Sequence, residues 1–394
     1  MAGYLQKLGD KKYKLWVSAG FGSGKKRIRN TRTITAKDDQ AAEKQLALFI
    51  AEVEHNENPT SGKMTFAQFV ERWRSTHAKK LAPKTRHGYN RMLDLRILDA
   101  MGHIRLDRLR PLHLLDFYEQ LRNPEVREDK GKEGPLSEQT ILHYHRLIST
   151  LLELAVKWQL LPNNIAKRVQ APSVPDRELP SYTRAQVREL MDKLEGQPLK
   201  YWLGVMIPLS CGLREGELFG LEWKHIDFKT RRVEVVQASQ YLPGEGIFTK
   251  APKTKSGKRK LKLPPFVIPV LQAWKAEQSA KKLKLGTKWY STDRIMTTWN
   301  GKAMYPGTMS QWFPKFLRDN GLAHMNFHGT RHTFATLMDR SAMSDADLSK
   351  LLGHTRVSTT KNMYTHADPG ADDQAADIME GLLAPKKKKR KKGA

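Results

Sequence analysis

The stretch APSVPDRELP at residues 171–180 limits most strongly how this chain can fold. Three prolines in ten residues favour an extended linker over a helix or an inner strand. A chain of 394 residues is also too long for one ordinary hydrophobic core. The sequence therefore predicts separate domains, with a linker at residues 172–180 and the last folded domain at residues 181–384.

Residues 1–58 predict a small α+β domain. The segments YLQKL, YKLWVSAGF and RIRNTRTI alternate as short strands do and are separated by glycine-containing turns. A helical pattern follows in AKDDQAAEKQLALFIAEVEHN, with acids in its first turn. We expect a three-stranded sheet covered by one helix.

Four segments within residues 64–171 have apolar residues at three- and four-residue spacing and predict an all-helical domain. They are MTFAQFVERWRSTHA, KTRHGYNRMLDLRILDAM, RPLHLLDFYEQLR and SEQTILHYHRLISTLLELAVKWQ. The domain at 181–384 opens with the helical TRAQVRELMDKL and is mainly α. It has strand-like interruptions at RRVEVVQASQ, GIFTKAPKT and KRKLKLP. Residues 385–394 form a basic tail.

The charge of the chain points to a polyanionic partner. The formal net charge is +28; seven positive charges lie in residues 386–392, which leaves +21 on the rest. Nucleic acid is the leading candidate and a membrane surface the weaker one. Residues 1–37 contain ten Lys or Arg residues and only one acidic residue, an Asp. We expect these strands to contact DNA, and the alternative is a solvated basic hairpin without a partner.

The candidate DNA-binding residues are basic side chains of the first two domains. They are Lys12, Lys14, Lys25, Lys26, Arg27, Arg29, Lys84 and Arg86.

Cysteine usage and hydropathy limit the compartment. The single cysteine, Cys211, excludes an internal disulfide and a zinc site built from cysteines, and it fits a reducing cytosol. We find no apolar run that would cross a bilayer and no signal-peptide pattern at the N-terminus. We expect a soluble, intracellular protein.

The stretch SCGLREGELFGLEWKHIDF predicts a cation at the start of a helix. Gly212 permits a tight turn, and EGELFGLEW has a helical pattern through Trp223. Arg214 then lies at a helix N-terminus, where a guanidinium and backbone N–H groups both favour an anion. Glu217 is expected to support this region. The alternative is an ordinary exposed ion pair, which contributes little.

The stretch HGTRHTFATLM places His328 and Arg331 three residues apart, on one helix face. A rival interpretation takes His328 and His332 as metal ligands. The zinc-protease pattern requires Glu after the first His, but Gly329 follows here and no Cys is near, so we expect no metal site.

Two further segments carry candidate reactive groups. In KTKSGKRKLKLP, Lys255 directly precedes a Ser-Gly turn and is the lysine best placed to project into a cleft. His354 and Tyr364 stand ten residues apart near the end of the chain. A lone Tyr usually packs. Here, two Arg, two His, one Lys and one Tyr together offer phosphate clamps, an acid and an attacking hydroxyl, which suits phosphodiester chemistry without a metal.

With these motifs in order, the sequence resembles the tyrosine recombinase family, in particular phage-type integrases and integrases of mobile elements. The first box is LSCGLREGELFGLEWKHID and the second is HGTRHTFATLMDRSAMSDADLSKLLGHTRVSTTKNMYTH. The resemblance implies as catalytic residues Arg214, Lys255, His328, Arg331, His354 and Tyr364, with Glu217 as structural support. Hairpin length varies in the family, so Lys253 and Lys258 stay alternatives to Lys255. The N-terminal sheet is similar to the arm-site-binding domains of some integrases.

The resemblance implies a mechanism without metal, cofactor or ATP. Tyr364 attacks the scissile phosphate to give a 3′-phosphotyrosyl link, and strand exchange passes through a Holliday junction. Arg214 and Arg331 stabilise the phosphate charge, His354 donates a further hydrogen bond, His328 is the base and Lys255 the acid.

The partners implied are double-stranded DNA with core and arm attachment sites and a homotetramer on that DNA. A DNA-bending accessory protein or an excision factor is a further candidate, and no membrane partner is expected. The residues after Tyr364 predict a short helix that docks on a neighbouring subunit.

The expected location is the cytoplasm of a prokaryotic host, associated with the nucleoid. The tail PKKKKRKKGA resembles a nuclear localisation signal; a DNA-gripping tail, an added nuclear signal and an inert tail all remain open. Two other functions also remain open: a type IB topoisomerase, and a non-enzymatic DNA-binding regulator that reads DNA through the N-terminal sheet.

Overall fold

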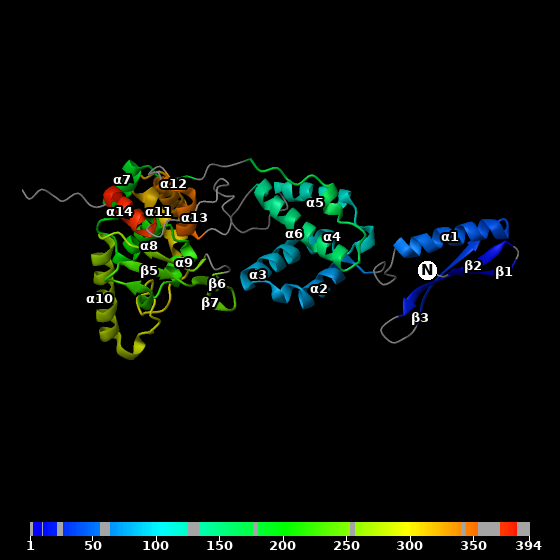
Figure 1. Cartoon of the computed structure of the whole chain (residues 1–394), viewed down its shortest axis with the longest axis horizontal. Coiled ribbons are helices and arrows are strands. Elements are labelled where there is room, and N and C mark those ends of the chain that lie inside the picture. Colours follow the sequence, from blue (N-terminus) through cyan, green and yellow to red (C-terminus); the bar gives the residue numbers. More distant parts are fainter. Residues whose placement is uncertain are drawn as a thin grey trace, which may run out of the picture. The chain divides into compact units, whose positions relative to one another are not determined.

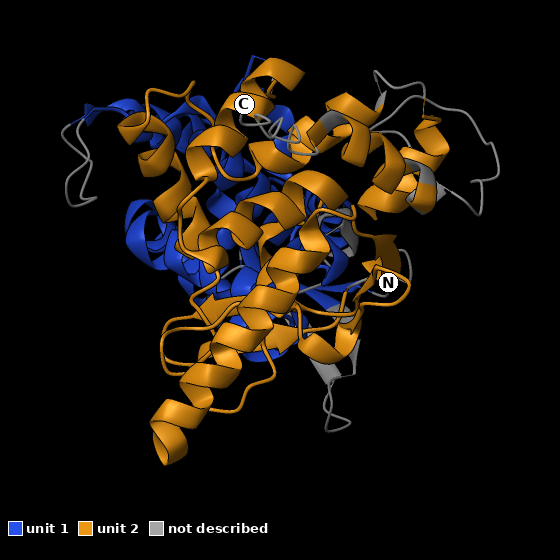
Figure 2. Ribbon diagram, turned by 90° about the vertical axis from the view of Figure 1, so that its left-hand side faces the viewer, with its two compact units in different colours: residues 1–176 blue, residues 177–394 orange. Residues whose placement is uncertain are grey.

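A computed structural model describes most of the chain in two compact units, residues 1–176 and 177–394 (Figure 2). The described residues are 3–9, 11–21, 27–55, 64–124, 134–175, 180–252, 257–339, 343–353 and 371–383.

An antiparallel sheet with one helix on it begins the first unit (Figure 1). Its strands are β1 (Gly3–Gly9), β2 (Lys12–Phe21) and β3 (Arg27–Thr35), in that order, and α1 (Asp39–His55) follows. Alternate β2 side chains, Tyr13, Leu15 and Val17, are buried against α1. The Tyr13 hydroxyl donates to Asp39 Oδ1 at 2.5 Å and thereby fixes the first turn of α1 to the sheet. The predicted sheet-plus-helix domain is confirmed.

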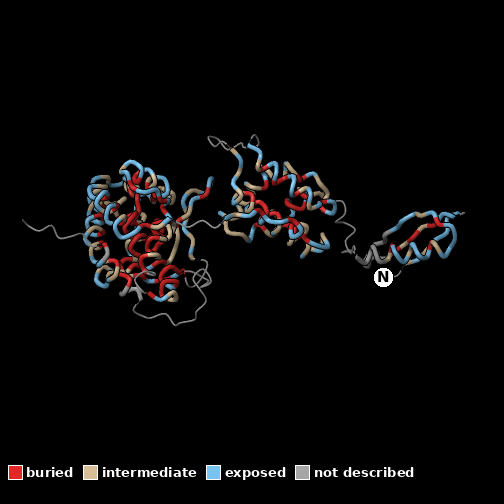
Figure 3. The backbone as a smooth tube through the Cα atoms, turned by 90° about the horizontal axis from the view of Figure 1, so that it is seen from above, coloured by how far each residue is buried: buried red, intermediate tan, exposed pale blue. Residues whose placement is uncertain are grey.

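The rest of the first unit is helical, as predicted. Its helices are α2 (Phe66–Thr76), α3 (Pro83–Met92), α4 (Leu98–Met101), α5 (Pro111–Arg122) and α6 (Glu138–Lys157). A π-helical segment, Leu93–Ile97, joins α3 to α4, so the second predicted run is one continuous helical stretch. Local signals set the starts: Thr65 and Gln68 form a capping box before α2, and Ser137 caps α6. A continuous core runs between these helices (Figure 3).

The second unit is mainly helical around α8 (Figure 1). Its helices are α7 (Arg184–Leu194), α8 (Leu199–Cys211), α9 (Glu215–Gly220), α10 (Val267–Leu285), α11 (Thr308–Asp319), α12 (Gly329–Asp339), α13 (Asp345–Leu352) and α14 (Ala371–Leu383). Helix α8 is buried from Leu203 to Cys211 and contacts α10, α11 and α12, so it forms the centre of this core.

Two small sheets complete the second unit. One has the order β4 (Ile226–Asp227), β5 (Arg232–Val235), β8 (Arg259–Lys262), and the other pairs β6 (Ala238–Leu242) with β7 (Gly246–Lys250). The predicted fold class is confirmed.

Two expectations for this unit are wrong in detail, and one close contact explains both. The stretch RRVEVVQASQ divides into β5 and β6 of different sheets, and the helix that begins at Glu215 ends at Gly220 rather than continuing through Trp223. A Cβ on Gly220 would lie 2.7 Å from the carbonyl oxygen of Gln237. The side chain of Gln237 also donates to the carbonyl of Gly220 at 2.9 Å. Because Gln237 contacts Gly220, the chain leaves the pairing of β5 after Val235, and α9 ends at Gly220.

Helix α14 packs on its own unit in this single chain. Ala375, Met379 and Leu383 are buried in the core, and Asp373 accepts from Arg232 at 3.1 Å and from Lys262 at 2.8 Å. Docking of this segment on a neighbouring subunit stays a prediction. Residues 354–370 and the tail at 384–394 lie outside the described residues.

In the part of the chain that the structure describes, no helix is long and apolar enough to cross a membrane.

A buried histidine makes the stability of α6 depend on pH. His145 Nδ1 lies 2.8 Å from the Tyr118 hydroxyl, and burial, assisted by the charge of Arg146, lowers the pKa of His145. The folded state then binds fewer protons than the unfolded state, whose histidine pKa is about 6.5. Stability is therefore expected to fall as pH drops below about 6.5. Hydrogen exchange of α6 amides, corrected for intrinsic rates, measures this between pH 7 and 5.

Substitution of two histidines on the same helix provides the control. His145→Gln should weaken the pH dependence, whereas the exposed His143→Gln should retain it. An unchanged pH dependence in His145→Gln would contradict the assignment.

Candidate active site

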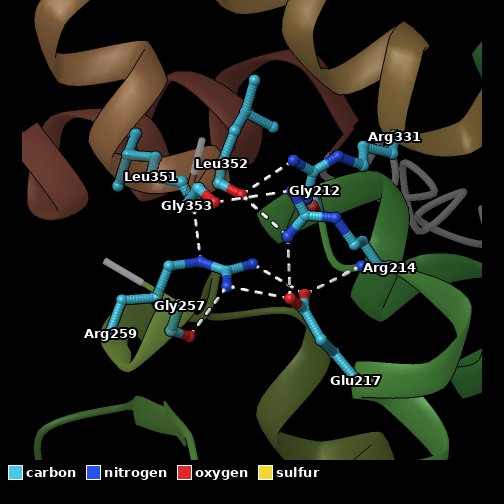
Figure 4. Close-up of polar contacts among 9 residues, drawn as sticks. All are labelled: Gly212, Arg214, Glu217, Gly257, Arg259, Arg331, Leu351, Leu352 and Gly353. Atoms are coloured by element: carbon cyan, nitrogen blue, oxygen red, sulfur yellow. Dashed lines mark hydrogen bonds and ion pairs between the residues drawn. The ribbon is translucent and has the colours of Figure 1, made fainter. Parts of the chain in front are cut away.

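Four chain segments from distant parts of the sequence meet in the second unit (Figure 4). Arg214 is the N-cap residue of α9, His328 directly precedes α12, and Arg331 lies in the first turn of α12. The other two segments are the C-terminal end of α13 and the start of β8.

Gly212 lets these segments approach. It caps α8 in the left-handed conformation, with φ of 63°, which a glycine adopts without strain. A Cβ at this position would lie 2.7 Å from side-chain atoms of both Leu352 and Phe334. The chain therefore turns from α8 towards Arg214 directly against α12 and α13.

One buried carboxylate, that of Glu217, is shared by two arginines. Glu217 Oε1 accepts from Arg214 NH1 at 2.9 Å and from Arg259 NH1 at 3.1 Å. Its Oε2 accepts from the Arg214 backbone N–H at 3.0 Å and from Arg259 NH2 at 2.8 Å. The Glu217 side chain is only 8% exposed. Burial would raise its pKa, but Arg259 and then Arg214 outweigh this and hold the pKa of Glu217 below its ordinary value.

The last carbonyls of α13 accept from the arginines. Arg331 donates to Gly212 O at 2.5 Å and to Leu352 O at 2.7 Å. Arg214 reaches Leu352 O and Gly353 O at 3.4 and 3.5 Å. These carbonyls have no partner within their helix and lie at the negative end of its dipole, so cations stabilise them.

The arginines differ in accessibility. The Arg214 side chain is 39% exposed, whereas Arg331 is buried. Burial, and secondarily the charge of Arg214, lowers the pKa of Arg331, yet an arginine remains charged at neutral pH. Arg214 is therefore a cation that an external anion can reach, and Arg331 adds positive charge behind it.

His328 lies at the solvent-accessible rim of this cluster. Its ring packs edge-on against His332, with the ring centroids 4.9 Å apart. Partial desolvation lowers the pKa of His328, and the neighbouring His332 and Arg331 lower it further. Neutral at pH 7, His328 can accept a proton. Within the described ranges, no group of three His, Cys, Asp or Glu side chains could hold a metal ion.

The structure brings together four of the predicted site residues: Arg214, Glu217, His328 and Arg331. Lys253, Lys255, His354 and Tyr364 lie outside the described residues. Lys258 is described and exposed. The contacts of the described residues therefore do not choose among the three hairpin lysines.

Arg259 is not among the residues that the sequence motifs predict for the site, because the hairpin is distinguished by its many lysines. A signal was present, because residues of a strand alternate between its two faces. Arg259, Leu261 and Leu263 share one face, and all three are buried. A charged residue in register with two buried leucines is rarely left without a partner.

The open face of the N-terminal sheet is a second surface with a distinct composition. The register pairs Tyr4 with Trp16 and Gln6 with Lys14, so these four side chains lie opposite the face that α1 covers. Tyr4 stacks on Trp16 at 5.7 Å, and Lys14 Nζ lies 4.6 Å from the Trp16 ring centroid. Lys12 lies on the same face. Aromatic rings combined with lysines suit contact with a polyanion.

The other predicted DNA-binding residues are less defined. Lys84 is exposed and Arg86 half-buried on α3. Since residues two apart on a helix do not share a face, one straight surface does not present both. Lys25 and Lys26, and the side chains of Arg27 and Arg29, lie outside the described residues.

Comparison with known families decides the class of the chain. Residues 181–370 match the phage integrase family, and residues 65–122 match the SAM-like N-terminal domain of phage integrases. Together the two matches span more than half of the chain. The chain belongs to the phage integrase family. It is an enzyme of the tyrosine recombinase class, an integrase of mobile elements.

This phage integrase is similar to a XerC-like tyrosine recombinase of Caldanaerobacter subterraneus, with 27% identity over 264 residues. The match covers 63% of this chain and 67% of that protein. Its fold is similar to that of the Tn1549 transposon integrase in complex with a circular intermediate DNA. The TM-score is 0.63 at 23% identity, over 82% of this chain and 100% of that one.

Its fold is also similar to that of lambda integrase, whose tetramer was solved bound to a Holliday junction. The TM-score is 0.54 at 16% identity, over 91% of this chain and 98% of that one.

Loss of the shared carboxylate of this phage integrase should destabilise the second unit. Glu217→Gln removes the negative charge that Arg214 and Arg259 share, and leaves Arg259 buried without this counter-charge. Breaking a buried ion pair typically costs about 3–5 kcal/mol. The free energy of unfolding from urea denaturation is the measurement. The exposed Glu234→Gln, on β5, should change it by less than about 0.5 kcal/mol. Equal effects of the two substitutions would contradict the assigned role of Glu217.

Proposed function

We propose that this phage integrase is a site-specific recombinase that cleaves and rejoins double-stranded DNA. The cycle passes through a 3′-phosphotyrosyl intermediate and a Holliday junction and integrates or excises a phage or mobile element. The observation that carries the proposal is the exposed guanidinium of Arg214, held by a buried carboxylate and backed by Arg331. Such a fork suits the nonbridging oxygens of a phosphodiester.

The first step exchanges one ester bond for another. The Tyr364 oxygen forms a bond to phosphorus, and the bond from phosphorus to the 5′-oxygen breaks. His328 takes the phenolic proton, because an unperturbed tyrosine has a pKa near 10. A hairpin lysine, Lys255 or its alternatives Lys253 and Lys258, protonates the leaving 5′-oxygen. Each proton transfer contributes about 10²–10⁴ in rate.

The remaining site residues stabilise charge. Arg214 and Arg331 offset the charge that develops on the phosphate oxygens, and His354 adds a hydrogen bond. The neutral form of His328, favoured by its lowered pKa, is the form that a general base requires. In this scheme the guanidinium groups provide the positive charge, and the phosphotyrosyl ester conserves the bond energy for rejoining, so neither a metal nor ATP enters.

The domains divide the work in the proposed function. Residues 1–58 bind arm-type DNA and residues 64–171 bind core DNA. Residues 181–384 perform the chemistry beyond the linker at 172–180. The tetramer of lambda integrase on a Holliday junction supports a homotetramer here. A DNA-bending protein or an excision factor is a further proposed partner.

A nicked suicide substrate with the attachment site tests the chemistry. Loss of the short cleaved fragment traps the phosphotyrosyl intermediate, so the wild-type protein should give a covalent adduct on a denaturing gel. Tyr364→Phe should give none, because it lacks the attacking oxygen. The same variant should retain the wild-type affinity for DNA.

Other outcomes of this experiment would support one of the two alternative functions. An adduct with relaxation of supercoiled DNA but no exchange between two sites would indicate a type IB topoisomerase. Binding without any adduct would indicate a non-enzymatic regulator.

The open face of the N-terminal sheet should bind arm DNA through phosphates and stacking. Lys14→Ala is expected to lower the slope of log affinity against log salt by about one, since one phosphate contact is lost. Trp16→Ala should weaken arm binding further, because it removes the ring that holds both Tyr4 and Lys14. Fluorescence anisotropy with arm DNA at several salt concentrations measures both effects.

Lys44→Ala is the matched control, because Lys44 is exposed on α1, on the covered side of the sheet. A change in slope equal to that of Lys14→Ala would contradict the assignment of the open face.

A further inference from the structure

Arg259 is a buried cation of the second unit that the proposed chemistry does not use. Its side chain is 6% exposed on β8, and its position is fixed by backbone pairing with Val235 of β5. A charged group at this depth is costly unless it is fully paired.

The donors of Arg259 bind three different segments. Nε donates to Leu351 O at 2.6 Å, at the end of α13. NH1 and NH2 donate to the two oxygens of Glu217 at 3.1 and 2.8 Å, a bidentate fork. NH1 also reaches Gly257 O at 3.4 Å, at the base of the lysine hairpin. All three nitrogens are engaged with the protein, so Arg259 is not arranged to bind a phosphate.

Arg259 acts on Arg214 through one carboxylate. Glu217 presents both oxygens to Arg259 and both to Arg214, so the orientation of the carboxylate is set from two sides (Figure 4). Held by Arg214 alone, the carboxylate would keep its bond to the Arg214 backbone N–H but could rotate about that bond with the partly exposed side chain. Because the fork of Arg259 is planar and anchored on α13 and β8, it prevents this rotation.

We propose that Arg259 is a positioning residue for the phosphate-binding arginine: it orients Glu217, which orients Arg214 towards the scissile phosphate. The proposal rests on the proposed function of Arg214. Its distinguishing consequence is that removal of Arg259 impairs the stabilisation of phosphate charge, as removal of Arg214 does.

The test compares cleavage of two suicide substrates. One has the ordinary scissile phosphate, and the other has a methylphosphonate, in which a methyl group replaces a charged nonbridging oxygen. Loss of one charge-stabilising donor typically costs about 10²–10³ in rate. A neutral substrate makes less use of that donor, so the loss should be much smaller there.

For Arg259→Met we expect a loss of about 10²-fold relative to wild type on the phosphate and less than about 10-fold on the methylphosphonate. Arg214→Met should show the same pattern. The double variant should be no slower than Arg214→Met, because the two residues act as one unit. Arg259→Lys keeps the charge but lacks the fork, and it should also be impaired on the phosphate.

Arg294→Met is the matched control. Arg294 is also a largely desolvated arginine of this unit; its side chain is 11% exposed and lies 3.6 Å from Glu222 and 2.8 Å from the carbonyl of Gly220. Any loss it causes should be equal on the two substrates. His328→Ala provides a catalytic control. Its loss should be equal on the two substrates, since a neutral phosphate analogue does not replace the missing base.

The outcomes separate the role of Arg259 from the function on which it rests. Equal losses on both substrates for Arg259→Met, or full activity of Arg259→Lys, would overturn the positioning role. If Arg259→Met does not fold, the comparison of Arg259→Lys on the two substrates decides. A failure of Arg214→Met to recover on the methylphosphonate would instead contradict the role of Arg214, and no cleavage by wild type would contradict the proposed function.

Discussion

The shared carboxylate of Glu217 is the interaction on which the second unit depends. Arg214 shares Glu217 with Arg259 and shares the carbonyl of Leu352 with Arg331, so three positive charges lie close together. Like charges at such separations repel strongly inside a protein. Glu217 offsets part of this charge, and the end of α13 contributes its partial negative charge. These polar contacts join α9, β8, α12 and α13, which also share one hydrophobic core. The cluster thus joins these elements, and it also presents positive charge to solvent at Arg214.

Much of the fold follows from local sequence. The strands of the N-terminal sheet and the helices of residues 64–171 have strong periodicity and clear caps, such as Thr65 with Gln68. The division between β5 and β6 could not be predicted, because the cause is the contact of Gln237 with Gly220 on another element. The early end of α9 has the same origin. A contact between residues that are distant in the sequence cannot be predicted from the pattern of a few neighbouring residues.

The candidate site was predictable to a similar extent. Arg214, His328 and Arg331 were identified from motif spacing, and the structure places them together. The burial of Glu217 was not predicted, because an Arg and a Glu three residues apart are most often an exposed pair. Arg259 was hidden among neighbouring lysines, although its strand register with Leu261 distinguished it. The choice of hairpin lysine and the role of Tyr364 as the nucleophile stay predictions.

The docking of α14 limits where the proposed nucleophile can act. Tyr364 lies eleven residues after Gly353 and seven before Ala371, and both ends are anchored, the second through Asp373 to β5 and β8. An extended chain spans at most about 3.5 Å per residue, so the tyrosine stays within about 25 Å of the start of α14. A phosphate beyond that radius is accessible only after α14 leaves its surface, so the strength of this docking sets the range of the nucleophile.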